Sequence, residues 1–269
     1  MATAPLQARL LARVDGGELA IPSLPQAAVE AMRELDRPEP RPRQLASILS
    51  TDAGFTAEVL RVASSALFGG GAPIVSLPQA ITRLGLQRIK ELAILVAARS
   101  RLALPGVLAQ PIRALLRHSL ATAIVANEIA RQRRARVEES FLAGLLHDLG
   151  RLVLLTALRD ELGDRPPPSA AELFALTDEL HGRVGALLVE RWGLGRAIRD
   201  AVGAHHAPRA DELAAVVALA DRIAHELLGD AVLPPDAPKV AAALDLYPED
   251  LEEIVARAGD LASTVAVIS

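Results

Sequence analysis

The sequence predicts an all-α fold. Alanine and leucine dominate a chain that is 51% hydrophobic and only 2% aromatic, and both residues are strong helix formers. Apolar residues recur at the three-and-four spacing of helix faces, whereas the alternation typical of strands is absent over any useful length. With 269 residues, the chain is long enough for one large helical domain or two smaller ones.

Capping and breaking residues divide this pattern into separate helices. Ser169 and Glu172 form a capping box directly after the breaker PPP at 166–168. Gly150 follows the apolar run FLAGLLHDL at 141–149 and is expected to end that helix. The predicted helices are, in order, 5–14, 24–36, 43–50, 55–67, 77–99, 112–134, 138–149, 151–161, 170–191, 195–206, 211–228 and 248–264.

Composition and charge argue against two classes of partner. The formal net charge is −4, and arginines are dispersed among aspartates and glutamates, so no broad surface that follows phosphates is expected. The few aromatic residues leave few platforms on which bases can stack. No apolar run approaches the ~20 residues of a transmembrane helix, and the N-terminus lacks a signal-peptide pattern. We therefore expect a cytoplasmic protein that binds neither nucleic acid nor membrane.

Histidines occupy inward or helix-end positions in the predicted helices. His118, for example, lies on the apolar stripe of helix 112–134, and His205 and His206 end a helix before Pro208. His225 lies four residues after Asp221, and we expect it to face solvent rather than to orient that aspartate. The residues that share the inward or helix-end placement are His118, His147, Asp148, His181, His205, His206 and Asp221.

This set of side chains predicts a site for a divalent metal. A buried carboxylate such as Asp148 is costly unless it is paired or coordinates a metal. The chain has no cysteine, and imidazole with carboxylate suits Fe, Mn, Zn or Ni. An aspartate that bridges two ions would explain Asp148, since two ions a few ångströms apart can clamp a phosphoryl group. The alternative is a cluster that is hydrogen-bonded without metal.

The order of these residues along the chain resembles that of the HD superfamily of metal-dependent phosphohydrolases. The stretches AGLLHDLGRLVL and HGRVGALLVERWGLGRAIRDAVGAHHAP are more specifically similar to the HDOD branch. The N-terminal half agrees through IPSLPQAAVEAMREL, LASILSTDAGFTAEVLRVASSALFGG and IVSLPQAITRLGLQRIKELAI. The resemblance covers about residues 19–228.

The resemblance implies a multi-helix HD-superfamily-like bundle with an N-terminal helical subdomain. It places the N-terminal subdomain of the HDOD module at 19–103 and the HD-like core at 111–229. The stretch 230–269 falls outside the resemblance, and its own sequence predicts a C-terminal helical extension. The resemblance also implies a role in bacterial signalling, as an output or scaffold module that binds a signalling protein partner or a nucleotide-type small ligand. The seven residues named above would hold one or two ions.

Two departures from the related cyclic-dinucleotide phosphodiesterases bear on catalysis. Arg151 stands where those hydrolases have a lysine, and the two cations are not interchangeable at a phosphate. The chain reads APRADEL after His206, where those enzymes have a GYP motif. The sequence therefore favours a binding module over an enzyme. The alternative is a metal-dependent phosphohydrolase acting on a nucleotide or cyclic dinucleotide, with Asp148 and Arg151 as candidate catalytic residues.

Overall fold

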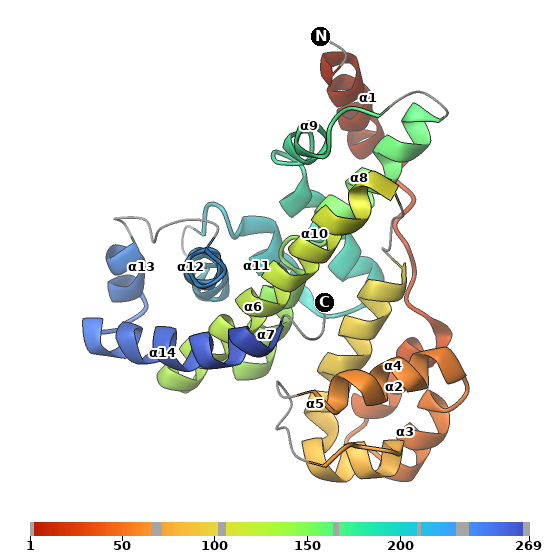
Figure 1. The fold of residues 1–269 in the computed structure, drawn as a ribbon, viewed down its shortest axis with the longest axis vertical. Helices are drawn as coiled ribbons and strands as arrows, with labels where there is room; N and C mark the ends of the chain where they lie inside the picture. Colours follow the sequence, from red (N-terminus) through yellow and green to blue (C-terminus); the bar gives the residue numbers. More distant parts are fainter. Residues whose placement is uncertain are drawn as a thin grey trace. The chain divides into compact units, whose positions relative to one another are not determined.

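The protein is described here by a computed structural model that covers residues 3–65, 72–101, 106–163, 167–208, 211–229 and 237–265. These residues form helices and no strand, which confirms the all-α prediction (Figure 1). The helices are α1 (Thr3–Asp15), α2 (Gln26–Leu35), α3 (Pro42–Leu49), α4 (Ala53–Ala63), α5 (Leu77–Arg101), η2 (Gly106–Leu108), α6 (Ala109–Arg133), α7 (Val137–Leu146), α8 (Gly150–Leu162), α9 (Ala170–Ala175), α10 (His181–Trp192), α11 (Arg196–Ala204), α12 (Glu212–Leu227), α13 (Ala237–Ala243) and α14 (Pro248–Val265).

The chain divides into two compact units, Met1–Pro22 with Leu102–Gly259, and Ser23–Arg101 with Asp260–Ser269. The three-part division into 19–103, 111–229 and 230–269 stays a prediction. Parts of those segments, 66–71, 102–103, 164–166, 209–210, 230–236 and 266–269, lie outside the described residues.

In the Ser23–Arg101 unit, α2, α3 and α4 each pack against α5. The sequence explains the start of α4, because the Asp52 carboxylate accepts a hydrogen bond of 2.9 Å from the backbone N–H of Phe55. Helix α5 differs from the continuous helix predicted at 77–99. Gly85 has φ 80° and ψ 166°, which breaks the helical path and leaves a kink.

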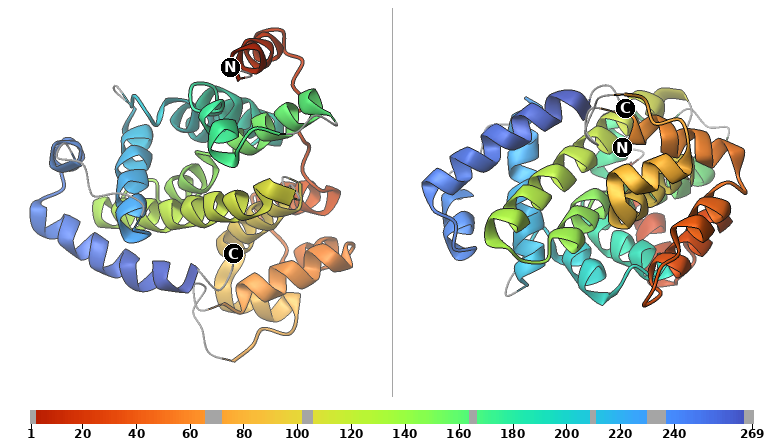
Figure 2. Two further views of the ribbon diagram at one scale, coloured as in Figure 1. Left: turned by 45° about the horizontal axis from the view of Figure 1, so that its top comes forward. Right: turned by 90° about the horizontal axis from the view of Figure 1, so that it is seen from below.

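In the other unit, the long helix α6 lies against α7 and α12, and α10 packs on both α8 and α11 (Figures 1 and 2). Most of the buried side chains at these crossings are aliphatic or small. Several of the largest among them, including Ile129, Leu145, Leu152 and Leu154, are fully buried. The core of this unit is therefore built mainly from aliphatic side chains, in keeping with the low aromatic content of the chain.

The segment Val137–Leu162 is the most apolar part of this core. It has the length and hydropathy of a membrane span, which corrects the expectation that no run of that length occurs. However, 89% of its 18-residue window is buried, and a turn after Leu146 separates it into α7 and α8. This segment is therefore part of the interior of its unit.

Candidate metal centre

His147 and Asp148 lie in the turn between α7 and α8. The predicted helix 138–149 ends earlier, at Leu146, and Gly150 begins the next helix instead of ending this one. Packing explains this correction. A Cβ on Gly150 would lie 2.0 Å from the carbonyl oxygen of His181, so only glycine allows α8 to begin against the first residue of α10. The same close approach brings His181 to the His147–Asp148 turn.

Helices α6 and α12 bring a second pair of side chains to this turn. The Nε2 atom of His118 lies 2.8 Å from Oδ1 of Asp221. The Nε2 atom of His147 lies 3.5 Å from the same oxygen and 3.8 Å from Oδ2 of Asp148, which is too long for a good hydrogen bond. Both histidines are buried, and each has one ring nitrogen with no hydrogen-bond partner among the described residues, Nδ1 of His118 and Nε2 of His147.

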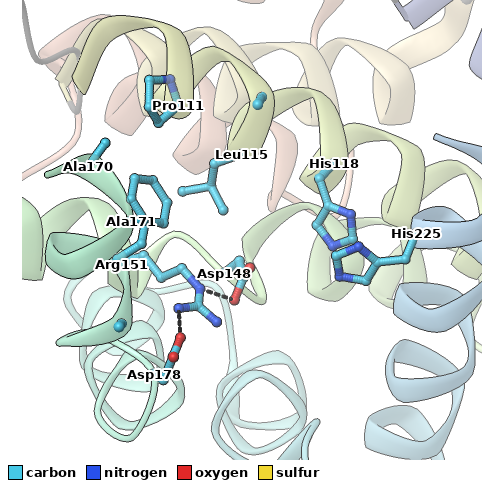
Figure 3. A pocket seen from close by; sticks show the side chains of 12 residues that line it. Pro111, Leu115, His118, Asp148, Arg151, Ala170, Ala171, Asp178 and His225 are labelled. Carbon is cyan, nitrogen blue, oxygen red and sulfur yellow. Dashed lines mark hydrogen bonds and ion pairs between the residues drawn. The ribbon is translucent and has the colours of Figure 1, made fainter. Parts of the chain in front are cut away.

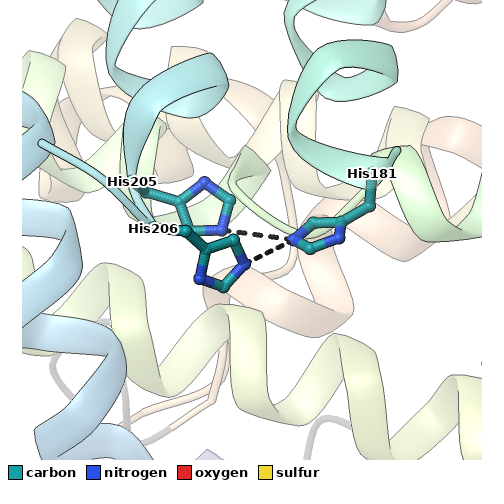
Figure 4. A group of neighbouring side chains, drawn as sticks. All are labelled: His181, His205 and His206. Carbon is teal, nitrogen blue, oxygen red and sulfur yellow. Dashed lines mark hydrogen bonds between the residues drawn. The ribbon is translucent and has the colours of Figure 1, made fainter. Parts of the chain in front are cut away.

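The other three histidines converge on the opposite side of Asp148. His181 begins α10, and His205 and His206 follow α11 (Figure 4). The Nε2 atom of His181 lies 3.4 Å from that of His205, 2.8 Å from that of His206 and 3.1 Å from Oδ1 of Asp148. Asp148 therefore lies between two groups of histidines.

Backbone carbonyls accept a hydrogen bond from one ring nitrogen of three buried histidines. The Nδ1 atoms of His147, His181 and His205 lie 2.8, 3.2 and 2.7 Å from the carbonyl oxygens of Gly144, Thr177 and Val202. A carbonyl only accepts, so each Nδ1 donates and, in the neutral ring, Nε2 is left as an acceptor. The lone pairs on Nε2 of His181 and Nε2 of His205 then point toward each other. A cation between the two nitrogens would stabilise this arrangement, because it would accept both lone pairs.

The charges within the centre also favour a cation. Burial lowers the pKa of His181 to about 4 and that of His205 to about 3, so both rings are neutral near pH 7. Burial also lowers the pKa of His147, but Asp148 and Asp221 outweigh this and raise it to about 9.

The two aspartates remain ionised in this setting. Burial raises the pKa of Asp148, but His147 and Arg151 hold it well below its usual value. Burial likewise raises the pKa of Asp221, but the hydrogen bond from His118 and the nearby ring of His147 lower it further than burial raises it. Two ionised carboxylates beside the neutral rings of His181 and His205 are a donor set for a divalent transition metal. The residues present therefore fit the metal that the sequence predicts.

A pocket of about 590 Å³ opens beside this centre (Figure 3). Its apolar wall includes Leu115 and Phe174, and its polar lining is His118, Asp148, Arg151, Asp178 and His225. The guanidinium of Arg151 donates to Oδ1 of Asp148 at 3.1 Å, to Oγ1 of Thr177 at 3.0 Å and to Oδ1 of Asp178 at 2.5 Å. The pocket thus gives a small ligand access to the carboxylate of Asp148 and to the guanidinium of Arg151.

The structure brings all seven predicted metal-site residues into one cluster, with candidate metal-binding groups His181–His205–His206, His118–His147–Asp148 and His118–Asp221–His225. That these side chains bind metal stays a prediction, as do the catalytic roles of Asp148 and Arg151. The side chain of His225 is 44% exposed, in line with the expectation that it faces solvent, but its ring also stacks on His118 with 4.1 Å between the ring centres. The spacing of four residues between Asp221 and His225 was the sequence signal for a place of His225 beside the cluster. No sequence signal identified Asp178 as a partner of Arg151.

Comparison with known proteins gives the family and the fold. The family model described as "HDOD domain" matches residues 21–208. An uncharacterised protein of Treponema pallidum (strain Nichols) is 26% identical over 213 residues; this is 76% of the chain but only 40% of the length of that relative.

Among solved structures, one from Shewanella amazonensis SB2B, named as a candidate metal-dependent phosphohydrolase, has a TM-score of 0.76. It is 21% identical, over 98% of each chain, so it supports the fold alone. An HDOD domain protein of unknown function from Geobacter sulfurreducens has a TM-score of 0.60 and is 25% identical, over 95% of this chain and 99% of that one. Both likenesses bear out the predicted HD-like helical fold.

Proposed function

Since the chain belongs to the HDOD family, we propose that it is a cytoplasmic signal-transduction module that binds a phosphorylated small ligand at a divalent-metal centre. One observation carries this proposal. The Nε2 atoms of His181 and His205 face one another as acceptors beside the ionised Asp148, and a ligand-sized pocket opens on that carboxylate. A signalling protein partner that responds to the ligand completes the proposed output role.

The donor groups divide into two sets around Asp148. His118, His147 and Asp221 would hold one ion. His181, His205 and His206 would hold a second, with Asp148 shared between the two sets. Fe, Mn, Zn and Ni all suit this mixture of imidazole and carboxylate. Bound there, a divalent ion would supply positive charge for phosphate oxygens and, for hydrolysis, an activated water.

Arg151 is the side chain that we expect to select for phosphate. Its guanidinium can form paired hydrogen bonds with a phosphate, but Asp148 and Asp178 already accept from it. Asp178 is 61% exposed, so its ion pair with Arg151 is the one that an incoming anion would replace at least cost. Leu115 and Phe174 offer an apolar surface for the rest of the ligand.

A second candidate function is hydrolysis of the bound phosphoester. The observation that favours it is the opening of the pocket on Asp148, where both donor sets meet. Such a site would expose both ions to the ligand. The absence of a GYP motif after His206 favours binding without turnover.

Metal analysis of protein purified without chelator tests the proposal. We expect one or two equivalents of a transition metal per chain, located by anomalous scattering at His147 and Asp148. The variant Asp148→Asn is expected to lose most of this metal, since it removes the shared carboxylate. Asp160→Asn is the matched control on α8, because Asp160 is exposed and bonds only Arg159 among the described residues. A wild-type centre that is folded and metal-free would refute the metal proposal and favour the hydrogen-bonded alternative.

A turnover screen separates the two candidate functions. Metal-loaded protein is incubated with phosphomonoesters, nucleotides and cyclic dinucleotides, and phosphate or product is measured. Turnover that Asp148→Asn abolishes, with the fold intact by circular dichroism, would favour the phosphohydrolase. Ligand binding without turnover would favour the signalling module.

A further inference from the structure

The turn between α9 and α10 supplies two neighbouring acceptors to one nitrogen of Arg151. The Nη1 atom donates to Oγ1 of Thr177 at 3.0 Å and to Oδ1 of Asp178 at 2.5 Å, so both of its N–H groups are used. The Nε atom of the same guanidinium donates to Oδ1 of Asp148 at 3.1 Å (Figure 3). The guanidinium is thus held by three acceptors.

We propose that Thr177 and Asp178 set the phosphate affinity of Arg151 in opposite directions. Thr177 is a positioning residue that holds the guanidinium at the pocket, and Asp178 competes with the incoming phosphate for it. This inference rests on the proposed function, since it concerns how phosphate binding at that same site is controlled. Neither residue belongs to the seven predicted metal-site residues.

The hydrogen bonds of the guanidinium indicate which acceptor a phosphate replaces. A phosphate accepts two parallel bonds from one edge of this group, either Nε with Nη2 or Nη1 with Nη2. Asp148 already accepts from Nε, and Thr177 and Asp178 accept from Nη1, so neither edge is free. Asp148 is 11% exposed, whereas Asp178 is 61% exposed, and the Asp178 carboxylate has no further hydrogen-bond partner in the described part of the chain. Asp178 is therefore the acceptor that leaves.

Thr177 holds Arg151 from behind the lining of the pocket. It is fully buried and does not line the pocket, whereas Arg151 and Asp178 do. Its hydroxyl donates to the carbonyl oxygen of Phe174 at 2.6 Å, which leaves the oxygen lone pairs for Arg151. Its own carbonyl oxygen accepts from the backbone N–H of His181 at 3.0 Å. These contacts fix Thr177, so it still holds the guanidinium after Asp178 has left.

Asp178 opposes anion binding in two ways. Its carboxylate is attached to the same turn as Thr177, so it competes for Nη1 at a high effective concentration. After displacement it remains on the turn beside the pocket, where its charge repels the phosphate. Both effects lower the affinity of the pocket for a phosphorylated ligand.

Calorimetric titration with phenyl phosphate tests both roles. The probe is a dianion at pH 8, and its ring suits the apolar wall of Leu115 and Phe174. The buffer contains Mn²⁺ to fill any metal site. We expect Asp178→Asn to bind the probe about fivefold more tightly than the wild type, since an exposed ion pair no longer competes. We expect Thr177→Val to bind it about tenfold more weakly, since the guanidinium loses its fixed acceptor.

Two further variants control for net charge and for folding. Glu179→Gln removes one negative charge from the residue after Asp178, which is exposed and does not line the pocket, so we expect it to bind the probe as the wild type does. Thr177→Ser keeps the hydroxyl and is expected to restore most of the affinity that Thr177→Val loses. Circular dichroism and Mn²⁺ uptake show that each variant is folded and that its metal centre is unchanged.

Failure of this inference differs from failure of the proposed function. If the wild type binds the probe and Asp178→Asn binds it equally tightly, or Glu179→Gln matches Asp178→Asn, then Asp178 does not compete for Arg151. If folded Thr177→Val binds as tightly as the wild type, Thr177 has no positioning role. Either result overturns the inference and leaves the proposed function standing. If no protein binds the probe, with or without Mn²⁺, the proposed function fails as well.

Discussion

Replacement of Gly150 by alanine tests the packing that assembles the metal centre. The added Cβ would lie 2.0 Å from the carbonyl oxygen of His181, 2.9 Å from its carbonyl carbon and 2.6 Å from the backbone nitrogen of Gly185. All three atoms belong to the backbone of α10, so no side chain can rotate away. Helices α8 and α10 must therefore separate until the closest distance reaches the 3.4 Å of ordinary contact.

The cost of this separation is set by overpacking in a filled core. Inserted methylene groups usually cost about 1–3 kcal/mol and occasionally more. Because the overlap here is with backbone, we expect Gly150→Ala to lose about 3 kcal/mol or more of unfolding free energy. In a unit of this size, that corresponds to a fall in Tm of roughly 6–12 °C. The displaced His181 is also expected to weaken metal binding.

Gly182→Ala is the matched control. Gly182 lies one residue after His181 on α10, and its added Cβ would lie 3.4 Å or more from its nearest neighbours. Alanine is a better helix former than glycine, so this variant is expected to gain up to about 1 kcal/mol.

Urea unfolding in EDTA, followed by tryptophan fluorescence, measures both variants. The chain has one tryptophan, Trp192, at the end of α10, so the signal reports on the unit that contains the metal centre. Chelator removes the stabilisation that bound metal would add. A loss below 1 kcal/mol for Gly150→Ala would refute the argument, because it would mean that α8 and α10 move apart at little cost.

Two further predictions concern protons and a buried hydrogen bond. Since the pKa of His147 is raised to about 9, its ring is protonated at pH 7, and a bound metal must displace that proton. Metal affinity is therefore expected to rise about tenfold per pH unit from pH 7 and to level off near pH 9. Calorimetry is expected to show one proton released per ion bound at pH 7. A metal affinity that is flat over this range would contradict the raised pKa of His147. Trp192→Phe removes a hydrogen bond of 2.8 Å to the carbonyl oxygen of Pro22 and some buried volume. We therefore expect the free energy of unfolding to fall by about 1–3 kcal/mol. Thermal unfolding followed by circular dichroism measures this loss, and an unchanged Tm would count against it.

The sequence predicts well where local periodicity determines the structure. The expected helix 112–134 is α6, and His118 on its apolar stripe is buried as expected. The capping box at Ser169 and Glu172 is also present, with both of its hydrogen bonds formed. These features depend on residues within one or two turns of each other, so the sequence contains the information that is needed.

The sequence predicts the structure poorly where a contact between distant segments determines where a helix ends or how a side chain lies. The expected helix 170–191 is divided into α9 and α10, although the residues between them are compatible with a helix. Between these helices, the hydroxyl of Thr177 accepts a hydrogen bond from Arg151 and donates one to the carbonyl oxygen of Phe174. The backbone of His181 packs against Gly150. Arg151 lies 26 residues from Thr177 in the chain, and Gly150 is similarly distant from His181. The stacking of His225 on His118 depends in the same way on how α12 crosses α6, which no local pattern determines.

Charge balance links metal and ligand in this centre. One divalent ion, with the proton of His147 displaced, matches the two buried carboxylates Asp148 and Asp221. A second ion would leave a buried excess of positive charge, since the charge of Arg151 is already offset by Asp178, and such an excess is costly in a poorly solvated site. A phosphate dianion from the pocket would offset this excess. Binding of the second ion and of the anion are therefore expected to be coupled, each raising the affinity for the other by the same factor. On this reasoning, we expect one ion per chain in the ligand-free protein and a second ion only when ligand binds, as the proposed signalling role requires.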